Sequence, residues 1–144
     1  MDHFGKRILV VEDDGEMRDL LKDFLKSEGY EVDSADNGSE AFRNLAKQSF
    51  DLIITDVRMP GLSGLDILPG IKKLQPQASV IVITAFGSDD VCHRAFEKGA
   101  SVYLKKPIHL PNLGILIHKL LPAKTAEEEE KNGWNSGYFS RKVS

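Results

Sequence analysis

The chain has 144 residues, the length of one domain and enough to bury a hydrophobic core without disulfides or a structural metal. Hydrophobic residues make up 41% of it and charged residues 28%, so most of the chain is expected to fold. The net charge of -3 gives no electrostatic basis for binding nucleic acid or an anionic membrane, and the single cysteine, Cys92, excludes a disulfide framework. With no signal peptide and no apolar run of membrane-spanning length in the sequence, we expect a cytoplasmic protein without membrane partners.

Short apolar runs alternate with longer amphipathic stretches. In chain order, a strand is predicted at 8–11, then a helix with the apolar stripe Met17, Leu20, Leu21, Phe24 and Leu25, a strand around Tyr30 and Val32, and a helix with Ala41, Phe42, Leu45 and Ala46. A strand at 52–54 follows, then a helix with Leu68, Ile71 and Leu74, a strand at 80–83, and a helix with Val91, Ala95 and Phe96 that ends at Gly99. The last two elements are a strand at 102–104 and a helix with Leu113, Leu116, Ile117, Leu120 and Leu121. The continuous apolar runs are typical of strands buried on both faces, whereas Tyr30 and Val32 alternate with acids and favour an edge strand.

Five strand–helix units in a row predict an α/β fold with an open parallel sheet covered by helices on both faces. Of the common doubly wound arrangements, the strand order 2-1-3-4-5 places the second strand at an edge, as its alternating pattern requires. We therefore predict a flavodoxin-like, three-layer (βα)5 sandwich. Ligands of such sheets bind beyond the carboxyl ends of the strands, where the winding reverses between the first and third strands.

Polar residues stand at these strand ends. They are Glu12, Asp13 and Asp14 after the first strand, Asp56 after the third, Thr84 after the fourth, and Lys105 and Lys106 after the fifth. Clustered carboxylates raise one another's pKa values unless a cation lies among them, and Mg²⁺ prefers such oxygen ligands. An aspartate can also act as a phosphoryl acceptor, with a metal, a lysine and a hydroxyl placed around the phosphoryl oxygens. The pattern therefore indicates a site for an anion that becomes covalently attached.

Over roughly residues 6–121 the chain resembles the receiver domain of two-component response regulators. The matching segments are 8–14 (ILVVEDD), 56–61 (DVRMPG) with Gly64, Thr84-Ala85, and 103–107 (YLKKP). The order of these motifs and their place at the strand ends make the resemblance highly specific. The chain departs from the commonest pattern in two places, because Ile108-His109 replaces a frequent aromatic–acid pair and Glu12 stands where many members have Asp.

The resemblance implies that Asp56 is the phosphoacceptor and that Mg²⁺ is the cofactor. Asp13 would bind the metal directly, Glu12 through water, and Arg58 through its backbone carbonyl, with Asp56 completing the protein ligands. Asp14, by contrast, is interpreted as an acid that favours the positive end of the first helix rather than as a ligand.

The resemblance also assigns the residues that respond to phosphorylation. Lys106 would pair with the phosphoryl group and is preferred over Lys105 because the family's lysine directly precedes the proline, commonly through a cis bond. Thr84 is the switch hydroxyl and Tyr103 the switch aromatic. Movement of Thr84 toward the phosphoryl group would open space into which Tyr103 can turn, which shifts an existing equilibrium between two states.

These roles predict a phosphorylation-activated switch that is not an enzyme toward other substrates and promotes only its own phosphorylation and dephosphorylation. Its partners would be a sensor histidine kinase or a histidine phosphotransfer protein, and a downstream protein or a second copy of the chain, bound through the fourth helix, fifth strand and fifth helix. No direct contact with nucleic acid is expected.

Three other functions fit the sequence less well. A flavin or nucleotide site on this fold needs a phosphate-cradling loop after the first strand, where Glu12-Asp13-Asp14 would repel phosphate. A phosphatase with an aspartate nucleophile would carry a second acid two residues later, where this chain has Arg58. A receiver-like module used only for binding would lack a site residue, and every expected one is in the sequence.

The receiver domain is predicted to span residues 6–121, followed by a C-terminal tail at 122–144. In the tail, Thr125-Ala126-Glu127-Glu128 has the form of a capping box and predicts a short helix. Trp134, Tyr138 and Phe139 then form an aromatic segment expected to pack beside the fifth helix. The tail is too short for an output domain, so we expect a receiver that acts alone. The alternative is a receiver fragment of a longer regulator whose DNA-binding or enzymatic output domain is missing.

Overall fold

A computed structural model of the protein describes residues 5–58, 63–85 and 87–121. Strands and helices alternate five times along it. The strands are β1 (Arg7–Val11), β2 (Glu31–Ala35), β3 (Leu52–Asp56), β4 (Ser79–Thr84) and β5 (Val102–Lys105). The helices are α1 (Gly15–Ser27), α2 (Gly38–Lys47), α3 (Gly64–Leu74), α4 (Asp89–Glu97) and α5 (Leu110–Leu120). Motif residues 59–61 and the tail 122–144, with its predicted helix and aromatic segment, lie outside the described residues.

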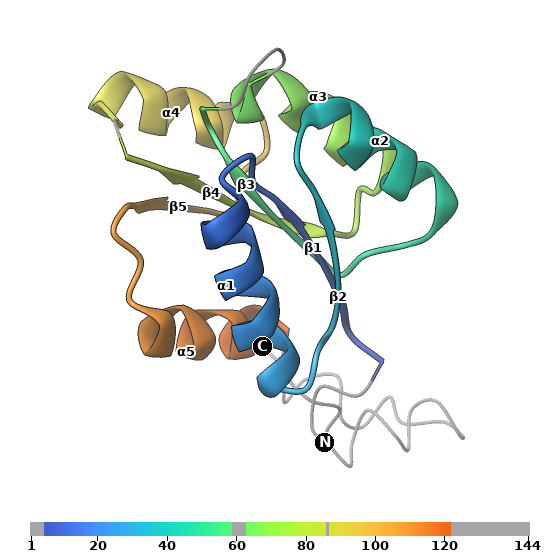
Figure 1. Ribbon diagram of the computed structural model, residues 1–144. Helices are drawn as coiled ribbons and strands as arrows, with labels where there is room; N and C mark the ends of the chain where they lie inside the picture. Colours follow the sequence, from blue (N-terminus) through green and yellow to red (C-terminus); the bar gives the residue numbers. More distant parts are fainter. Residues whose placement is uncertain (1–4, 59–62, 86, 122–144) are drawn as a thin grey trace, which may run out of the picture.

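The five strands form one parallel sheet in the order β2-β1-β3-β4-β5, which confirms the predicted topology. Helices α1 and α5 cover one face of the sheet and α2, α3 and α4 cover the other (Figure 1). The winding reverses at β1, whose neighbours are β2 and β3. The carboxyl ends of β1 and β3 therefore border the crevice in which a doubly wound sheet binds its ligands.

Two hydrophobic clusters hold the layers together, one on each face of the sheet. Leu9 and Val11 of β1 pack with buried residues of α2, α3 and α4, while Ile8 and Val10 point the other way and pack with those of α1 and α5. All four side chains are at most 1% exposed. Because successive side chains of a strand point to opposite faces, the continuous apolar run follows directly from burial on both sides, as predicted.

The sequence predicted more burial than the structure shows, both along β5 and at the sides of the helices. Strand β5 is only half-buried because it forms the edge of the sheet opposite β2. On the helices, Leu20, Leu74 and Phe96 are 50%, 52% and 47% exposed, and Ala46 is exposed as well. Each lies beside the part of the apolar stripe that contacts the sheet, so helical spacing alone predicted a contact face wider than the one formed.

Polar caps fix where the helices begin. The side chains of Asp14, Asn37, Ser63 and Ser88 each accept a hydrogen bond from a backbone N–H in the first turn of α1, α2, α3 and α4. Gly99 follows the last turn of α4 with φ at 116°, which confirms the predicted end of that helix. None of the helices in the described residues is long and apolar enough to cross a membrane.

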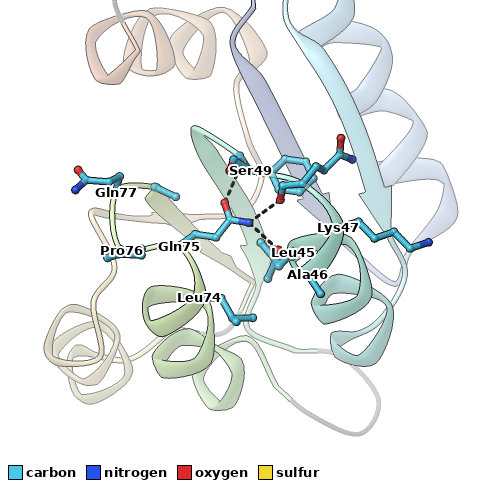
Figure 2. A pocket seen from close by; sticks show the side chains of 11 residues that line it. Leu45, Ala46, Lys47, Ser49, Leu74, Gln75, Pro76 and Gln77 are labelled. Carbon is cyan, nitrogen blue, oxygen red and sulfur yellow. Dashed lines mark hydrogen bonds between the residues drawn. The ribbon is translucent and has the colours of Figure 1, made fainter.

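Gln75 joins the C-terminal ends of α2 and α3, close to where β3 and β4 begin and thus at the end of the sheet away from the carboxyl ends of the strands (Figure 2). Its side chain is buried and donates to the carbonyls of Leu45 and Gln48 at 3.0 and 2.7 Å, while its oxygen accepts from the Phe50 N–H at 2.7 Å. The first two bonds satisfy carbonyls that the end of α2 leaves without a helical partner, and the third satisfies the N–H of Phe50 in the segment before β3. A buried amide therefore fixes the entry of the chain into β3.

Substituting Gln75→Ala should lower the free energy of unfolding by about 2–4 kcal/mol, because it leaves buried backbone groups without hydrogen-bond partners. Gln77→Ala, two residues away and exposed, is the matched control and should change the free energy by less than about 0.5 kcal/mol. Chemical denaturation measures both values. Equal effects of the two substitutions would contradict the role given to Gln75.

Candidate functional site

Three carboxylates meet at the carboxyl ends of β1 and β3, as the sequence predicted. Glu12 and Asp13 directly follow β1, and Asp56 is the last residue of β3. One oxygen from each lies within 4.8 Å of the others. Glu12 and Asp56 are 2% and 5% exposed, whereas Asp13 is exposed to solvent. The cluster is thus buried at Glu12 and Asp56 and open to solvent at Asp13, from which side a ligand can approach.

Lys106 reaches this cluster from the end of β5. Its Nζ donates to Asp56 Oδ2 at 2.5 Å and to Glu12 Oε1 at 3.3 Å. Its backbone N–H donates to the Thr84 carbonyl at 2.8 Å, which ties the loop after β5 to the end of β4. The peptide bond from Lys106 to Pro107 is cis, as the resemblance implied, and Lys105 is exposed. The preference for Lys106 over Lys105 agrees with this geometry.

The loop after β3 positions the other oxygen of Asp56. Asp56 Oδ1 accepts from the backbone N–H of Arg58 at 2.8 Å, and the loop closes through a bond from the Gly64 N–H to the Val57 carbonyl at 2.9 Å. A Cβ on Gly64 would lie 2.2 Å from the Asp56 carbonyl oxygen, far inside van der Waals contact. Glycine is therefore required at position 64 for the chain to return so close to Asp56.

The charges in the site are not balanced. Burial raises the pKa of Glu12 to about 7, and the nearby charge of Asp56 adds to this, although the Asp14 N–H and Lys106 act in the opposite direction. For Lys106, burial lowers the pKa, but the hydrogen bond and charge of Asp56, together with Glu12, outweigh it and hold the pKa above its usual value. The ammonium is therefore firmly protonated, while Glu12 still resists ionisation.

This donor set fits a hard divalent cation. Carboxylate oxygens are the ligands that Mg²⁺ prefers, and a cation among Glu12, Asp13 and Asp56 would favour the ionised form of Glu12, which burial and the charge of Asp56 disfavour. The exposed side of Asp13 leaves room for the water ligands that Mg²⁺ usually keeps. The Arg58 carbonyl stays a predicted ligand.

Two neighbouring residues have structural roles. Asp14 caps α1, because its carboxylate accepts from the N–H groups of Glu16 and Met17 at 3.0 and 3.3 Å, which agrees with its interpretation as a residue of the helix end. The Arg18 guanidinium donates to the Glu12 carbonyl at 2.8 Å and supports the loop that carries the acids. Arg18 cannot be identified from the sequence, since a bond to a backbone carbonyl six residues away has no local sequence signal.

Thr84 and Tyr103 come together at Gly87, where Thr84 Cγ2 and the Tyr103 hydroxyl both lie close to the glycine. Thr84 ends β4 and is 0% exposed, and the Tyr103 ring packs against the core under α2, α3 and α4. The Tyr103 hydroxyl is buried and has no hydrogen-bond partner among the described residues. Burial, followed by the nearby Cys92 and Asp89, raises the pKa of this hydroxyl. The hydroxyl is thus buried although the residue as a whole is only partly so.

Comparison with known proteins places this geometry in a family. The model of the response regulator receiver domain matches residues 8–118. A response regulator receiver domain protein of Methanospirillum hungatei superimposes with a TM-score of 0.78 at 31% identity, covering 88% of this chain and 98% of that one. The response regulator TrrA of Thermotoga maritima, solved in complex with Mg(2+)-BeF, superimposes with a TM-score of 0.72 at 40% identity, covering 81% and 99%.

The curated relatives differ in length. The response regulator protein PilR of Pseudomonas aeruginosa is 38% identical over 125 residues, which are 87% of this chain and 28% of PilR. The sporulation initiation phosphotransferase F of Bacillus subtilis is 32% identical over 121 residues, which are 84% of this chain and 98% of that protein. The DNA-binding transcriptional regulator NtrC of Azospirillum brasilense, of which the chain spans 24%, is 40% identical. Such relatives do not support the expectation that nucleic acid is not bound.

The raised pKa of Glu12 predicts a pH dependence of stability in Mg²⁺-free buffer. Folded Glu12 keeps its proton up to a pH of about 7, whereas the unfolded chain releases it near the ordinary value of 4.5. The folded state then binds more protons, so the free energy of unfolding should fall as pH rises between these values, by on the order of 2 kcal/mol.

Denaturation in EDTA from pH 5 to 8 measures this slope. Glu12→Gln should flatten it, and Glu16→Gln, which changes an exposed acid on α1, should leave it as in the unaltered protein. The same slope in all three proteins would show that Glu12 is not the group responsible.

Proposed function

Because the chain belongs to the response regulator receiver domain family, we propose that it is a switch in which Asp56 accepts a phosphoryl group from the phosphohistidine of a sensor histidine kinase or phosphotransfer protein. An Asp56 oxygen attacks phosphorus, the bond between phosphorus and the histidine nitrogen breaks, and the imidazole leaves with the electron pair. The chain would act on no other substrate and would promote only its own phosphorylation and dephosphorylation.

The geometry around Asp56 carries this proposal. Its carboxylate lies in the buried part of the cluster and is held by two hydrogen bonds, from the Arg58 N–H to Oδ1 and from the Lys106 ammonium to Oδ2. A carboxylate oxygen can accept two hydrogen bonds, so each retains a lone pair for attack. After transfer the Lys106 ammonium can follow the charge from the carboxylate to a phosphoryl oxygen, because it already contacts the acceptor.

We assign the metal site to Glu12, Asp13 and Asp56, with the Arg58 carbonyl as a further ligand. A bound Mg²⁺ would neutralise the charge of the phosphoryl oxygens as they approach three acids. The proximity of the three carboxylate oxygens supports this assignment. The Mg(2+)-BeF complex of the relative TrrA supports it as well.

The response to phosphorylation is assigned to Thr84 and Tyr103. A phosphoryl dianion attracts the Thr84 hydroxyl, and a change at Thr84 alters the space next to the Tyr103 ring. Phosphorylation would then shift an existing equilibrium between two positions of the Tyr103 ring. Tyr103 lies in β5 between α4 and α5, so α4, β5 and α5 form the surface proposed to bind a downstream protein or a second copy of the chain.

Two forms of output agree with the relatives. Phosphotransferase F, covered over 98% of its length, favours a receiver that acts through protein contacts. PilR and NtrC, covered over 28% and 24%, favour a receiver unit that controls a longer regulator, with DNA contacts made by the output part. The chemistry at Asp56 is the same in both.

Incubation with acetyl phosphate and Mg²⁺ should add the mass of one phosphoryl group. Asp56→Asn or EDTA should abolish the addition, because the first removes the nucleophile and the second the cation. Asp36→Asn, which changes another aspartate directly after a strand, should leave it intact. Intact-protein mass spectrometry measures the product, and label that persists on the Asp56→Asn protein would contradict the assignment.

Beryllofluoride with Mg²⁺, which mimics the phosphoryl group, should shift amide resonances of α4, β5 and α5 as well as those of the site. Backbone NMR spectra recorded during the titration measure these shifts. The Asp56→Asn protein serves as the control and should show none. Shifts confined to the loops after β1, β3 and β4 would mean that the signal does not reach the proposed binding surface.

A further inference from the structure

We propose that Gly87 controls the switch by leaving the space that the Tyr103 ring needs in its buried position. A side chain at position 87 would hold Tyr103 in an exposed position and weaken its coupling to Asp56. The inference rests on the proposed function, because Thr84 and Tyr103 are taken as the residues that respond to phosphorylation. It adds a third residue, one that touches neither the phosphoryl group nor the metal.

The geometry at Gly87 leaves no room for a Cβ. A Cβ built there would lie 1.6 Å from the Tyr103 hydroxyl oxygen, 2.7 Å from its Cζ and 2.8 Å from the Thr84 Cγ2. The first distance is about that of a covalent bond, so the tyrosine and a larger residue cannot occupy these positions together. The tyrosine hydroxyl therefore fills the place of the missing side chain.

The backbone does not itself require glycine at this position. Gly29 and Gly99 have φ values of 100° and 116°, which disfavour other residues, whereas Gly87 is not among the glycines with positive φ. An alanine would therefore be acceptable to the main chain of residue 87. The obstacle to it lies in the two side chains, Tyr103 and Thr84.

Of these two side chains, Tyr103 is the one able to yield. Thr84 is 0% exposed at the end of β4, a strand with neighbours on both sides. Tyr103 lies in the edge strand β5 and is only partly buried, so its ring can turn about χ1 toward solvent. A Cβ at position 87 should therefore expel the ring and leave the sheet intact.

Two opposing contributions act on the buried position of Tyr103. Packing of the ring against the core favours it, but the hydroxyl is buried without a hydrogen-bond partner among the described residues, which opposes it. Because the two contributions oppose each other, a small change in the surrounding space can shift the population. Thr84 and Gly87 both border that space, and Thr84 is the residue proposed to respond to a phosphoryl group on Asp56.

The test compares Gly87→Ala with Gly15→Ala, a control in which the added Cβ would meet nothing closer than an Arg18 nitrogen at 3.6 Å. In the unaltered protein and the control, NMR should show a cross-peak between the Tyr103 ring and the Thr84 methyl group. In Gly87→Ala this cross-peak should be lost, and the pKa of the Tyr103 hydroxyl, followed with ¹³Cζ-labelled tyrosine, should fall toward about 10, the value of an exposed tyrosine.

The functional readout is the affinity for beryllofluoride in the presence of Mg²⁺. If phosphorylation favours the buried ring, then expelling the ring must by reciprocity weaken binding of the mimic, and we expect about a tenfold loss in Gly87→Ala. The resonances of α4 and β5 should also cease to respond to the mimic. Gly15→Ala should bind it as the unaltered protein does.

A double variant, Gly87→Ala with Tyr103→Ala, shows whether the clash with the tyrosine ring causes the effect and controls for a loss of stability. With Tyr103→Ala in place the severe clash is gone and only the 2.8 Å approach to Thr84 Cγ2 remains, so adding Gly87→Ala should change stability and beryllofluoride affinity much less than it does when the tyrosine is present. An equally large effect of Gly87→Ala without the tyrosine ring, or an unchanged cross-peak and titration in Gly87→Ala, would overturn the inference. Failure of the unaltered protein to bind beryllofluoride would instead refute the proposed function, since the cross-peak and the titration do not depend on the mimic.

Discussion

The placement of Glu12 and Asp56 side by side, both almost fully buried, is the constraint on which the rest of the site depends. Burial is the main cause of the raised pKa of Glu12, and the like charge of Asp56 beside it raises that pKa further. Lys106 offsets part of this effect by contacting both carboxylates. A cation at the open side, next to Asp13, would offset more. In the proposed function this confined negative charge attracts Mg²⁺, which in turn would offset the charge of the incoming phosphoryl group.

The sheet makes this confinement possible. Parallel strands end at the same edge, so the residues after β1, β3 and β5 meet although they are far apart in the sequence. Buried apolar layers on both faces hold these strand ends in place, and local contacts then set the fine geometry. The close return of the chain at Gly64 and the bond from the Lys106 N–H to the Thr84 carbonyl are two such contacts. Fold stability and site geometry thus depend on the same strands.

The sequence predicted the strand order and the meeting of Glu12, Asp13, Asp56 and Lys106, because both follow from periodicity and from the rule that parallel strands end together. It predicted less well the features that depend on tertiary contact. Helical spacing could not show that Leu20 and Phe96 would remain exposed. Gln75 and Gly87 were missed, since a glutamine after a helix and a glycine in a loop show their roles only when the backbone groups or the tyrosine ring beside them are placed.

The central claim is that the confined negative charge attracts the cation, and the affinity for Mg²⁺ tests it most directly. Lys106→Met removes the ammonium that competes with a cation for Asp56 and Glu12 while keeping a side chain of similar length. Calorimetric titration with Mg²⁺ should therefore show binding tighter by about tenfold in Lys106→Met than in the unaltered protein. Unchanged or weaker binding would contradict the account, because it would mean that the balance of charge between the carboxylates and Lys106 does not set the affinity of the site.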